Sequence, residues 1–323
     1  KIDTFSIGYN EYKNYCELPF AKITSNHINS NHHEIIIDKK NYIDSFYNTL
    51  EFFDEPHGDS AAVPLNFLLK NVKDFGVNSL LSGEGADELF FGYDNYAKFL
   101  KYHKFEKSLS KEQNEFLNEI ISALQNNTKE SEYLRRVVKK QNIYNSFGEI
   151  FNDIQKRKLF VKVPTFKSET PKQDFVDNMS YIDLKLWVSN PVLTKVYKVS
   201  KENSLQIHTP FLDNDLLKYV FSIESSIKMG NTNKYLLKKI ASKYIPEQII
   251  NRTKKGFNSP FNEWLQDEFG SSILDSILEV NRQTGFFNEN YLKQIYTLAS
   301  SNKFKQHLYS LFVFSLWYKK VYL

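Results

Sequence analysis

The chain has 323 residues, a length that predicts one to three domains around a buried core. Hydrophobic residues make up 41% of the chain and charged residues 25%, as is usual for globular proteins. The net charge of +4 is small and spread along the sequence. Nucleic-acid-binding proteins gather basic residues on one face, so the charge pattern argues against a nucleic-acid partner.

Cysteine usage and hydropathy limit the cellular setting. Cys16 is the only cysteine, so the chain can form neither an internal disulfide nor a thiolate metal cluster. No apolar run is long enough to span a bilayer, and no signal peptide opens the chain. We therefore predict a cytoplasmic protein without a membrane partner. Because Lys1 leads directly into a strand-like segment, we also expect further sequence upstream.

The first part of the chain alternates strand and helix patterns. Strands are predicted at residues 4–9, 34–38 and 78–82, and helices at residues 17–25, 41–53 and 61–75. This alternation is typical of α/β proteins with a doubly wound parallel sheet. We assign residues 1–95 to this α/β part.

Helical periodicity dominates residues 96–323, with few strand signals. Helices are predicted at residues 111–125, 130–140, 174–199, 213–221, 233–244, 260–269, 288–300 and 304–321. Residues 155–172 contain two prolines and are predicted to be a connector. A break at Asn190-Pro191 is predicted to interrupt the helix at 174–199. This mostly α-helical region is expected to pack on the α/β part.

A glycine-rich turn follows the third predicted strand. The run Ser-Gly-Glu-Gly-Ala-Asp-Glu extends from Ser82 to Glu88. In open α/β sheets, ligands bind beyond the carboxyl ends of the strands. Glycines let the backbone approach a ligand closely, and N–H groups at a helix start attract anions. We therefore predict that this turn contacts a phosphate-containing ligand.

Three carboxylates, Glu84, Asp87 and Glu88, crowd the same turn. Beside a polyphosphate, they predict a bound Mg²⁺ ion, which prefers one or two carboxylates together with phosphate oxygens and water. An acidic helix start alone would explain Asp87 and Glu88 but not the paired glycines around Glu84. The turn is not a dinucleotide-binding fingerprint, because Glu88 occupies the third glycine position.

The segment from Ser82 to Tyr93 resembles the signature loop of glutamine-hydrolysing asparagine synthetases, members of the ATP pyrophosphatase superfamily. Other pieces resemble further motifs of that family and follow in the same order. They lie at residues 4–9, 32–34, 54–60, 209–213, 234–238, 246–249 and 252–265. The resemblance covers roughly residues 4–266, and the joint order of the pieces makes it specific.

The resemblance implies a fold of the adenine nucleotide alpha-hydrolase type and a synthetase reaction. Enzymes of this family join ATP to a substrate carboxylate, release pyrophosphate, and let ammonia attack the acyl-adenylate. The implied cofactors are ATP and Mg²⁺, and the implied partners are a small carboxylic acid and ammonia derived from glutamine. Many members of the family are homodimers.

Matching positions imply the nucleotide and metal contacts. Ile7 would contact adenine through its backbone. Ser82, Gly83 and Gly85 would border the nucleotide, and Asp87 would hold Mg²⁺.

Two further positions carry the implied catalytic roles. Glu84 would accept a proton from the incoming amine, and Lys254 would neutralise charge that develops on the phosphates. Alone, Lys254 is better explained as a solvated loop lysine. Its place between Arg252 and Gly256, as in the family, favours the functional interpretation.

The chain departs from the family pattern in two ways. The pyrophosphate-binding loop Ser-Gly-Gly-x-Asp-Ser and the glutaminase domain are expected upstream of Thr4, so this chain by itself is expected to turn over little ATP. Tyr197-Lys198 and Gln206-x-His208 stand where many relatives carry Asp-Arg and Glu-x-Arg. A guanidinium binds a carboxylate through two parallel hydrogen bonds, which histidine cannot reproduce.

The departures leave several functions open. L-aspartate is the first candidate for the acceptor, and another acid, such as a sugar acid, is the alternative. A second alternative is a catalytically inactive scaffold or regulatory protein. A nucleic-acid-modifying enzyme on the same sheet is disfavoured by the dispersed charge.

Overall fold

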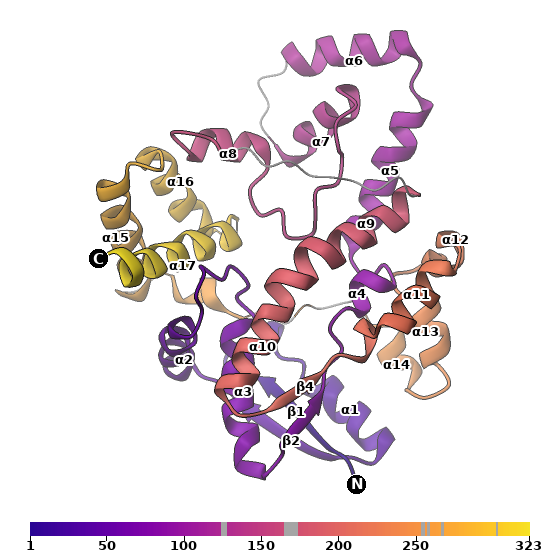
Figure 1. Ribbon diagram of the computed structural model, residues 1–323, viewed down its shortest axis with the longest axis vertical. Coiled ribbons are helices and arrows are strands. Elements are labelled where there is room, and N and C mark those ends of the chain that lie inside the picture. The colour runs from indigo at the N-terminus through magenta and orange to yellow at the C-terminus, as the bar shows by residue number, and fades with distance from the viewer. Residues whose placement is uncertain (124–127, 165–173, 253–255, 257–258, 266–267, 302) are drawn as a thin grey trace.

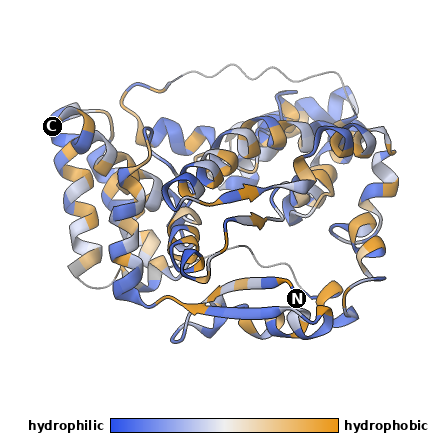
Figure 2. Ribbon diagram, turned by 60° about the horizontal axis from the view of Figure 1, so that its bottom comes forward, coloured by the Kyte–Doolittle hydropathy of each residue, from blue (hydrophilic) through white to orange (hydrophobic). Residues whose placement is uncertain are grey.

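The computed structural model describes residues 1–123, 128–164, 174–252, 256, 259–265, 268–301 and 303–323. Helices surround two short pairs of parallel strands (Figure 1). Strand β1 (Asp3–Gly8) pairs with β2 (Asn31–Ile36), and β3 (Ser79–Leu81) pairs with β4 (Gln206–His208). Figure 2 shows the two pairs lying apart. The predicted α/β class is confirmed, whereas the described strands do not form one doubly wound sheet.

Helix α3 joins the two strand pairs through one hydrophobic cluster. Leu69 and Val72 of α3 (Ala62–Val72) pack in this cluster with Ile35 of β2, Leu80 of β3 and Ile207 of β4. Helix α1 (Leu18–Ile28) forms the crossover that the parallel strands β1 and β2 require, and α2 (Lys39–Glu51) follows β2. The two strand pairs are therefore held together by side-chain packing rather than by a shared ladder of hydrogen bonds.

The next helices lead from the centre of Figure 1 to its top. They are α4 (Ala86–Leu89), α5 (Asp94–Ser108), α6 (Lys111–Ala123), α7 (Lys129–Val138) and α8 (Asp153–Leu159). Helix α8 corrects the prediction of a connector at residues 155–172, although residues 165–173 lie outside the described part. Asn152 and Gln155 form a capping box that begins α8.

A continuous helical rod crosses the centre of Figure 1. It consists of α9 (Phe175–Asp183), a π-helical segment η3 (Leu184–Val192) and α10 (Leu193–Glu202). The predicted break at Asn190-Pro191 is wrong, because Pro191 lies inside the π-helical segment. Proline in an α-helix clashes with the carbonyl four residues earlier. The wider π turn accommodates the ring without ending the rod.

The remaining helices form two groups on either side of the rod (Figure 1). One group contains α11 (Asn214–Ser222), α12 (Ser225–Met229), α13 (Tyr235–Ala241) and α14 (Glu247–Ile250). The other contains α15 (Glu268–Thr284), α16 (Glu289–Ser300) and α17 (Lys305–Tyr322). The helix predicted at residues 260–269 is instead a 3₁₀ turn, Phe261–Trp264, and the start of α15.

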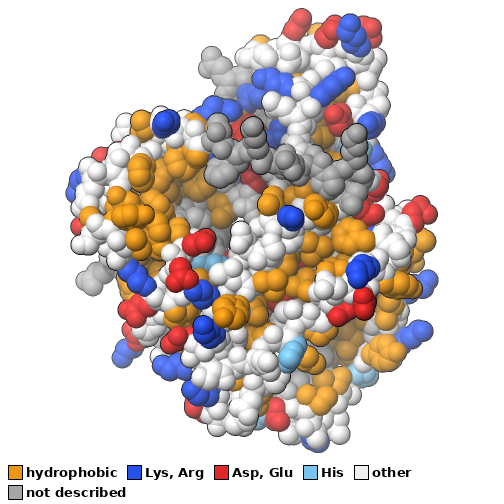
Figure 3. All heavy atoms as spheres, viewed as in Figure 1, with side chains coloured by type: hydrophobic (Ala, Val, Ile, Leu, Met, Phe, Trp, Pro, Cys, Tyr) orange, Lys and Arg blue, Asp and Glu red, His pale blue; other side chains and the backbone are white. Residues whose placement is uncertain are grey.

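Helix α17 forms the centre of the largest hydrophobic cluster, where it packs on α2. The rings of Phe46 in α2 and Phe312 in α17 stack with their centroids 5.3 Å apart. Figure 3 shows hydrophobic side chains gathered over α15–α17, and acidic and basic side chains intermixed on the same face. Among the described helices, none combines the length and apolar character needed to cross a membrane.

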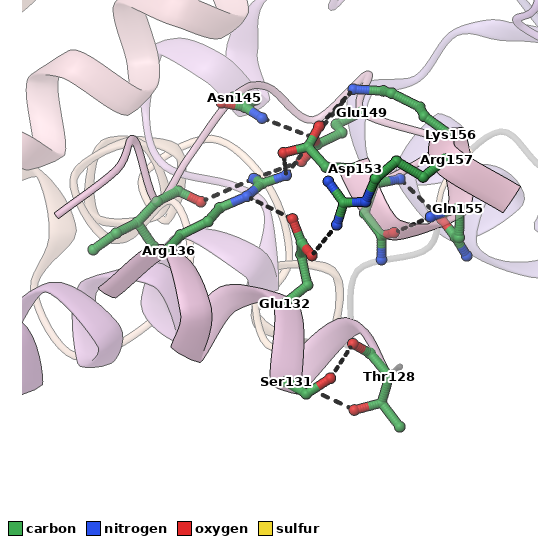
Figure 4. A network of polar contacts seen from close by, with 12 residues as sticks. Thr128, Ser131, Glu132, Arg136, Asn145, Glu149, Asp153, Gln155, Lys156 and Arg157 are labelled. Atoms are coloured by element: carbon green, nitrogen blue, oxygen red, sulfur yellow. Dashed lines mark hydrogen bonds and ion pairs between the residues drawn. The ribbon is translucent and has the colours of Figure 1, made fainter. Parts of the chain in front are cut away.

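A buried arginine organises the upper helical region (Figure 4). The side chain of Arg136 is only 2% exposed, and its guanidinium contacts Glu149 at 2.8 Å, Asp153 at 3.3 Å and Glu132 at 3.4 Å. These carboxylates come from α7, from the segment after it and from α8. Burying a charge is costly unless it is paired and hydrogen-bonded, and this network satisfies both conditions.

We expect Arg136→Met to lower the free energy of unfolding by about 3–5 kcal/mol, because it leaves buried carboxylates without their cation. Arg157→Met is the matched control, since Arg157 is 60% exposed and lies 4.0 Å from Glu132 in the same network. The control should cost no more than about 1 kcal/mol. Urea unfolding of both variants measures the difference, and equal losses would contradict the assigned role of Arg136.

Candidate functional site

The glycine-rich turn lies at the carboxyl ends of β3 and β4. The Ser82 N–H donates a hydrogen bond to the His208 carbonyl at 2.8 Å, which continues the β3–β4 pairing into the turn. Gly83 is exposed, and a side chain added there would meet no atom within 4 Å. Ser82 and Gly83 therefore border open space at the sheet edge where ligands of α/β proteins bind.

The second glycine of the turn faces the protein. Gly85 has φ +89°, and a Cβ atom there would collide with the Leu212 side chain. Leu212 belongs to a 3₁₀ turn, Pro210–Leu212, which follows β4. Both the positive φ and the close approach require glycine at this position. Gly85 thus lets the turn pack on the segment after β4.

Asp87 lies at the start of α4 and faces a lysine. Its Oδ1 atom is 3.0 Å from Lys234 Nζ, and its side chain is 22% exposed. Gly92 permits this arrangement, because a Cβ atom there would collide with both Asp87 and Lys234. The Lys234 N–H also contacts the Phe91 carbonyl at 3.4 Å. The start of α13 is therefore tied to the end of the turn.

Glu88 points in the opposite direction, into the protein. It is 3% exposed and accepts a hydrogen bond from the Tyr93 hydroxyl at 2.6 Å. Burial raises the pKa of Glu88 to about 7. The Ser180 hydroxyl donates to the Glu88 carbonyl at 2.8 Å, which ties α4 to α9. Glu88 is thus placed to hold the turn on the helical region.

Glu84 faces a third direction and meets a buried lysine. Lys195 Nζ in α10 lies 3.5 Å from Glu84 Oε1 and 2.8 Å from Asp59 Oδ2. The side chain of Glu84 is 30% exposed, whereas that of Lys195 is 7% exposed. Glu84 therefore has a cation on its inner side and remains accessible from outside.

The three carboxylates of the turn do not converge as the sequence suggested. Glu84, Asp87 and Glu88 have separate partners: Lys195, Lys234 and Tyr93. Within the part of the chain that is described, no group of three or more His, Cys, Asp or Glu residues could hold a metal ion. A divalent cation would thus have to share one carboxylate with oxygens of a ligand.

A cavity of about 280 Å³ adjoins the end of β1. Ile7 lines it together with Phe5, Phe20 and Arg252. The Arg252 guanidinium lies 4.7 Å from the Phe20 ring centroid and forms an ion pair with Glu17, which also lines the cavity. Aromatic and aliphatic walls with one guanidinium suit a flat heteroaromatic group. The predicted residue Lys254 lies outside the described residues, so its position relative to this cavity is not specified.

A family profile described as "Asparagine synthase" matches residues 1–319. The chain belongs to the asparagine synthase family. Asparagine synthetase (glutamine-hydrolysing) 1 of Bacillus subtilis is 28% identical over 98% of this chain and 52% of its own length. A relative from Mycobacterium bovis is 25% identical over 98% of this chain and 50% of its own length. Asparagine synthetase (glutamine-hydrolysing) 3 of B. subtilis is 24% identical over 87% of this chain and 43% of its own length.

The chain spans about half the length of the curated relatives that it matches, and this is their C-terminal half. The recognised resemblance to the synthetase part of the family is thus confirmed. The structure brings Ser82, Gly83 and Glu84 together at one sheet edge, with Asp87 at the start of the next helix. Ile7 lies in the other strand pair, where it lines the cavity.

Sequence reasoning missed the two lysines that contact the turn. Lys195 and Lys234 lie in or beside helices, where a lysine is usually solvated. Lys195 is only 5% exposed and occupies the inward face of an amphipathic helix, which is the one signal that could have indicated its role. At the altered acceptor positions, Tyr197 is 59% exposed and Lys198 forms an ion pair with Asp54.

We expect Gly85→Ala to lower the free energy of unfolding by about 1–3 kcal/mol, because φ +89° is strained for alanine and its methyl group would displace Leu212. Gly83→Ala is the control, since its added methyl meets open space. It should change the free energy of unfolding by no more than about 0.5 kcal/mol. Urea unfolding compares the two, and equal destabilisation would contradict the packing argument.

The buried His57 is expected to make part of the free energy of unfolding sensitive to acid. Burial lowers the pKa of His57 to about 4, and its ring stacks on Phe53 at 4.3 Å. The unfolded chain takes up a proton near the ordinary pKa of about 6.5, whereas the folded protein does not until about pH 4. The contribution of His57 to the free energy of unfolding is thus complete above pH 6.5, falls by up to about 3 kcal/mol toward pH 4, and then levels off.

We expect His57→Phe to reduce the fall in the free energy of unfolding between pH 6.5 and 4. The phenylalanine keeps a ring beside Phe53 but cannot titrate. His27→Phe is the control, because His27 is exposed. Urea unfolding at a series of pH values measures both slopes. An unchanged slope in His57→Phe would show that other groups cause the acid sensitivity.

Proposed function

We propose that the protein containing this chain is an ATP-dependent amide-forming ligase of the cytoplasm. It adenylates L-aspartate, releases pyrophosphate and forms asparagine with ammonia derived from glutamine. The observation that carries this proposal is the glycine turn at the ends of β3 and β4, in a chain that matches the asparagine synthase family over residues 1–319. An open sheet edge with an accessible carboxylate suits a nucleotide and an acid that react with each other.

The proposed ATP ligand would contact the described residues at two separate places. The cavity at Ile7 suits adenine, whose ring would pack on the apolar walls. Ser82 and Gly83 present backbone to the open edge and suit the AMP phosphate. Asp87 fits Mg²⁺ as one carboxylate that shares the ion with phosphate oxygens, and Mg²⁺ would supply charge neutralisation there.

The chemistry proceeds in two steps. An oxygen of the substrate carboxylate attacks the α-phosphorus of ATP, and pyrophosphate leaves. Ammonia then attacks the acyl carbon, Glu84 accepts a proton from the nitrogen, and AMP leaves with the electron pair of the broken bond. Lys254 is proposed to neutralise charge on the phosphates during the first step.

One feature supports the parts of the proposal that lie outside this chain. Leu81 in β3 is 78% exposed, although strands of parallel sheets are normally covered on both faces. We infer that further strands and the pyrophosphate-binding loop come from upstream sequence and complete one doubly wound sheet. The glutaminase domain would come from the same upstream part.

A different acid is the second candidate for the acceptor. Lys198 pairs with Asp54, and the polar side chains of Gln206 and His208 lie in β4 beside the turn. This set lacks the guanidinium that binds a carboxylate most specifically. It would suit a substrate with more hydroxyl groups and fewer charges, such as a sugar acid.

We expect the full-length gene product to release pyrophosphate from ATP and Mg²⁺ in the presence of ammonia and L-aspartate. Asparagine detected by mass spectrometry would identify the product. Release with a sugar acid but not with L-aspartate would support the second acceptor. No release with any carboxylic acid tested would contradict the ligase and favour a scaffold role.

Separate Asp87→Asn and Lys254→Ala variants should each lower the rate of release by about 100-fold, because each removes a charge proposed to act on the phosphates. Asp215→Asn is the control for the first variant, since this side chain on α11 is 93% exposed. Normal release by both site variants would contradict the residue assignments.

A further inference from the structure

The Lys195 ammonium is buried between two carboxylates that come from distant parts of the chain. It lies 2.8 Å from Asp59 and 3.5 Å from Glu84, and the Lys195 residue is 5% exposed. Burial alone would lower the pKa of Lys195, but Asp59 and Glu84 outweigh this effect and raise it. Lys195 is therefore a cation inside the protein.

Both carboxylate oxygens of Asp59 have partners inside the protein. Its Oδ1 atom accepts the Ala61 N–H at 3.0 Å, while its Oδ2 atom contacts Lys195. Burial favours the protonated form of Asp59, yet Lys195 outweighs burial and lowers the pKa. Asp59 is thus the closer of the two anions that neutralise Lys195.

The titratable groups around Glu84 give the cluster a net charge of −1. Glu84 and Asp59 each contribute one negative charge, and Lys195 contributes one positive charge. His57 also acts on Asp59 and Lys195, but burial lowers its pKa to about 4, so it is neutral near pH 7.

We propose that Lys195 is a positioning residue that holds the Glu84 carboxylate at the open sheet edge, with Asp59 as the second anion that fixes the Lys195 ammonium in place. This inference rests on the proposed function, in which Glu84 takes a proton from the incoming amine. Without Lys195, the partly exposed Glu84 side chain would lose this ion pair and could rotate away from the incoming nitrogen. Amide formation would then slow because its base is displaced, whereas adenylation does not require Glu84.

The test compares two half-reactions in the full-length protein. Isotope exchange between pyrophosphate and ATP, in the presence of the acid substrate, reports adenylation, and amide production with ammonia reports the later step. Lys195→Met alone would leave Asp59 buried and unpaired, which can prevent folding. The double variant Lys195→Met/Asp59→Asn removes both charges and keeps the shapes of the side chains.

We expect the double variant to exchange pyrophosphate within about threefold of the wild-type rate and to form amide about 100-fold more slowly. Adding Glu84→Gln should slow amide formation no further, because residues that act as a unit are not additive. Lys195→Arg should restore part of the rate, since it keeps the positive charge. Lys201→Met, on the exposed side of α10, is the control and should leave both steps unchanged.

The outcomes separate this inference from the proposed function. Wild-type protein without exchange for any acid would contradict both. Exchange in the wild type, with both steps slowed equally in the double variant, would show that Lys195 is only structural. Exchange with amide formation at the wild-type rate in the double variant would show that Glu84 does not need Lys195.

Discussion

The ion pair between Lys195 and Asp59 joins parts of the fold that share no backbone pairing. Lys195 belongs to the central rod, Asp59 to the segment before α3, and their contact spans 136 residues of sequence. Because both groups are buried, neither can move away without leaving an unpaired charge inside the protein. The position of the rod relative to the segment before α3 therefore depends on this pair, and the same lysine is the cation that Glu84 contacts.

The C-terminal helix supports this arrangement from behind. Gln306 in α17 donates a hydrogen bond to the Gly58 carbonyl, next to Asp59, and the Trp317 indole N–H donates to the Asp54 carbonyl at 2.7 Å. These contacts hold both ends of the segment at residues 54–59. A helix that carries no recognisable motif thus takes part in placing the charges of the candidate site.

Sequence patterns were sufficient to predict an element where its residues have partners nearby in the sequence, or where many residues repeat with the period of a helix or strand. The strands at β1, β2 and β3 and most of the long helices follow from such patterns. Strand β4 was missed because it has three residues, two of them polar, and it exists only by pairing with β3. The roles of Lys195 and Lys234 were missed for a related reason. A lysine on a helix looks solvated until distant carboxylates are brought to it.

The glycine turn illustrates how packing and ligand chemistry overlap in one motif. Gly85 and Gly92 are required by contacts with Leu212 and Asp87, so they would be glycines even if no ligand approached them. Gly83 has no such contact and borders the open edge instead. A sequence motif cannot separate these causes, whereas the surroundings of each glycine do.

The partners of the charged groups around the turn also differ between its inner side and its accessible side. Behind the turn, Asp183 is fully buried and accepts hydrogen bonds from the hydroxyls of Tyr96, Tyr144 and Ser146 and from the Phe147 N–H. These are neutral donors, which satisfy a buried carboxylate without adding mobile charge. At the accessible side, by contrast, carboxylates meet lysine side chains. Lys234, whose side chain is 26% exposed, is thus placed where an anionic ligand could exchange partners with it, and neutral hydrogen bonds are placed where the structure has to stay unchanged.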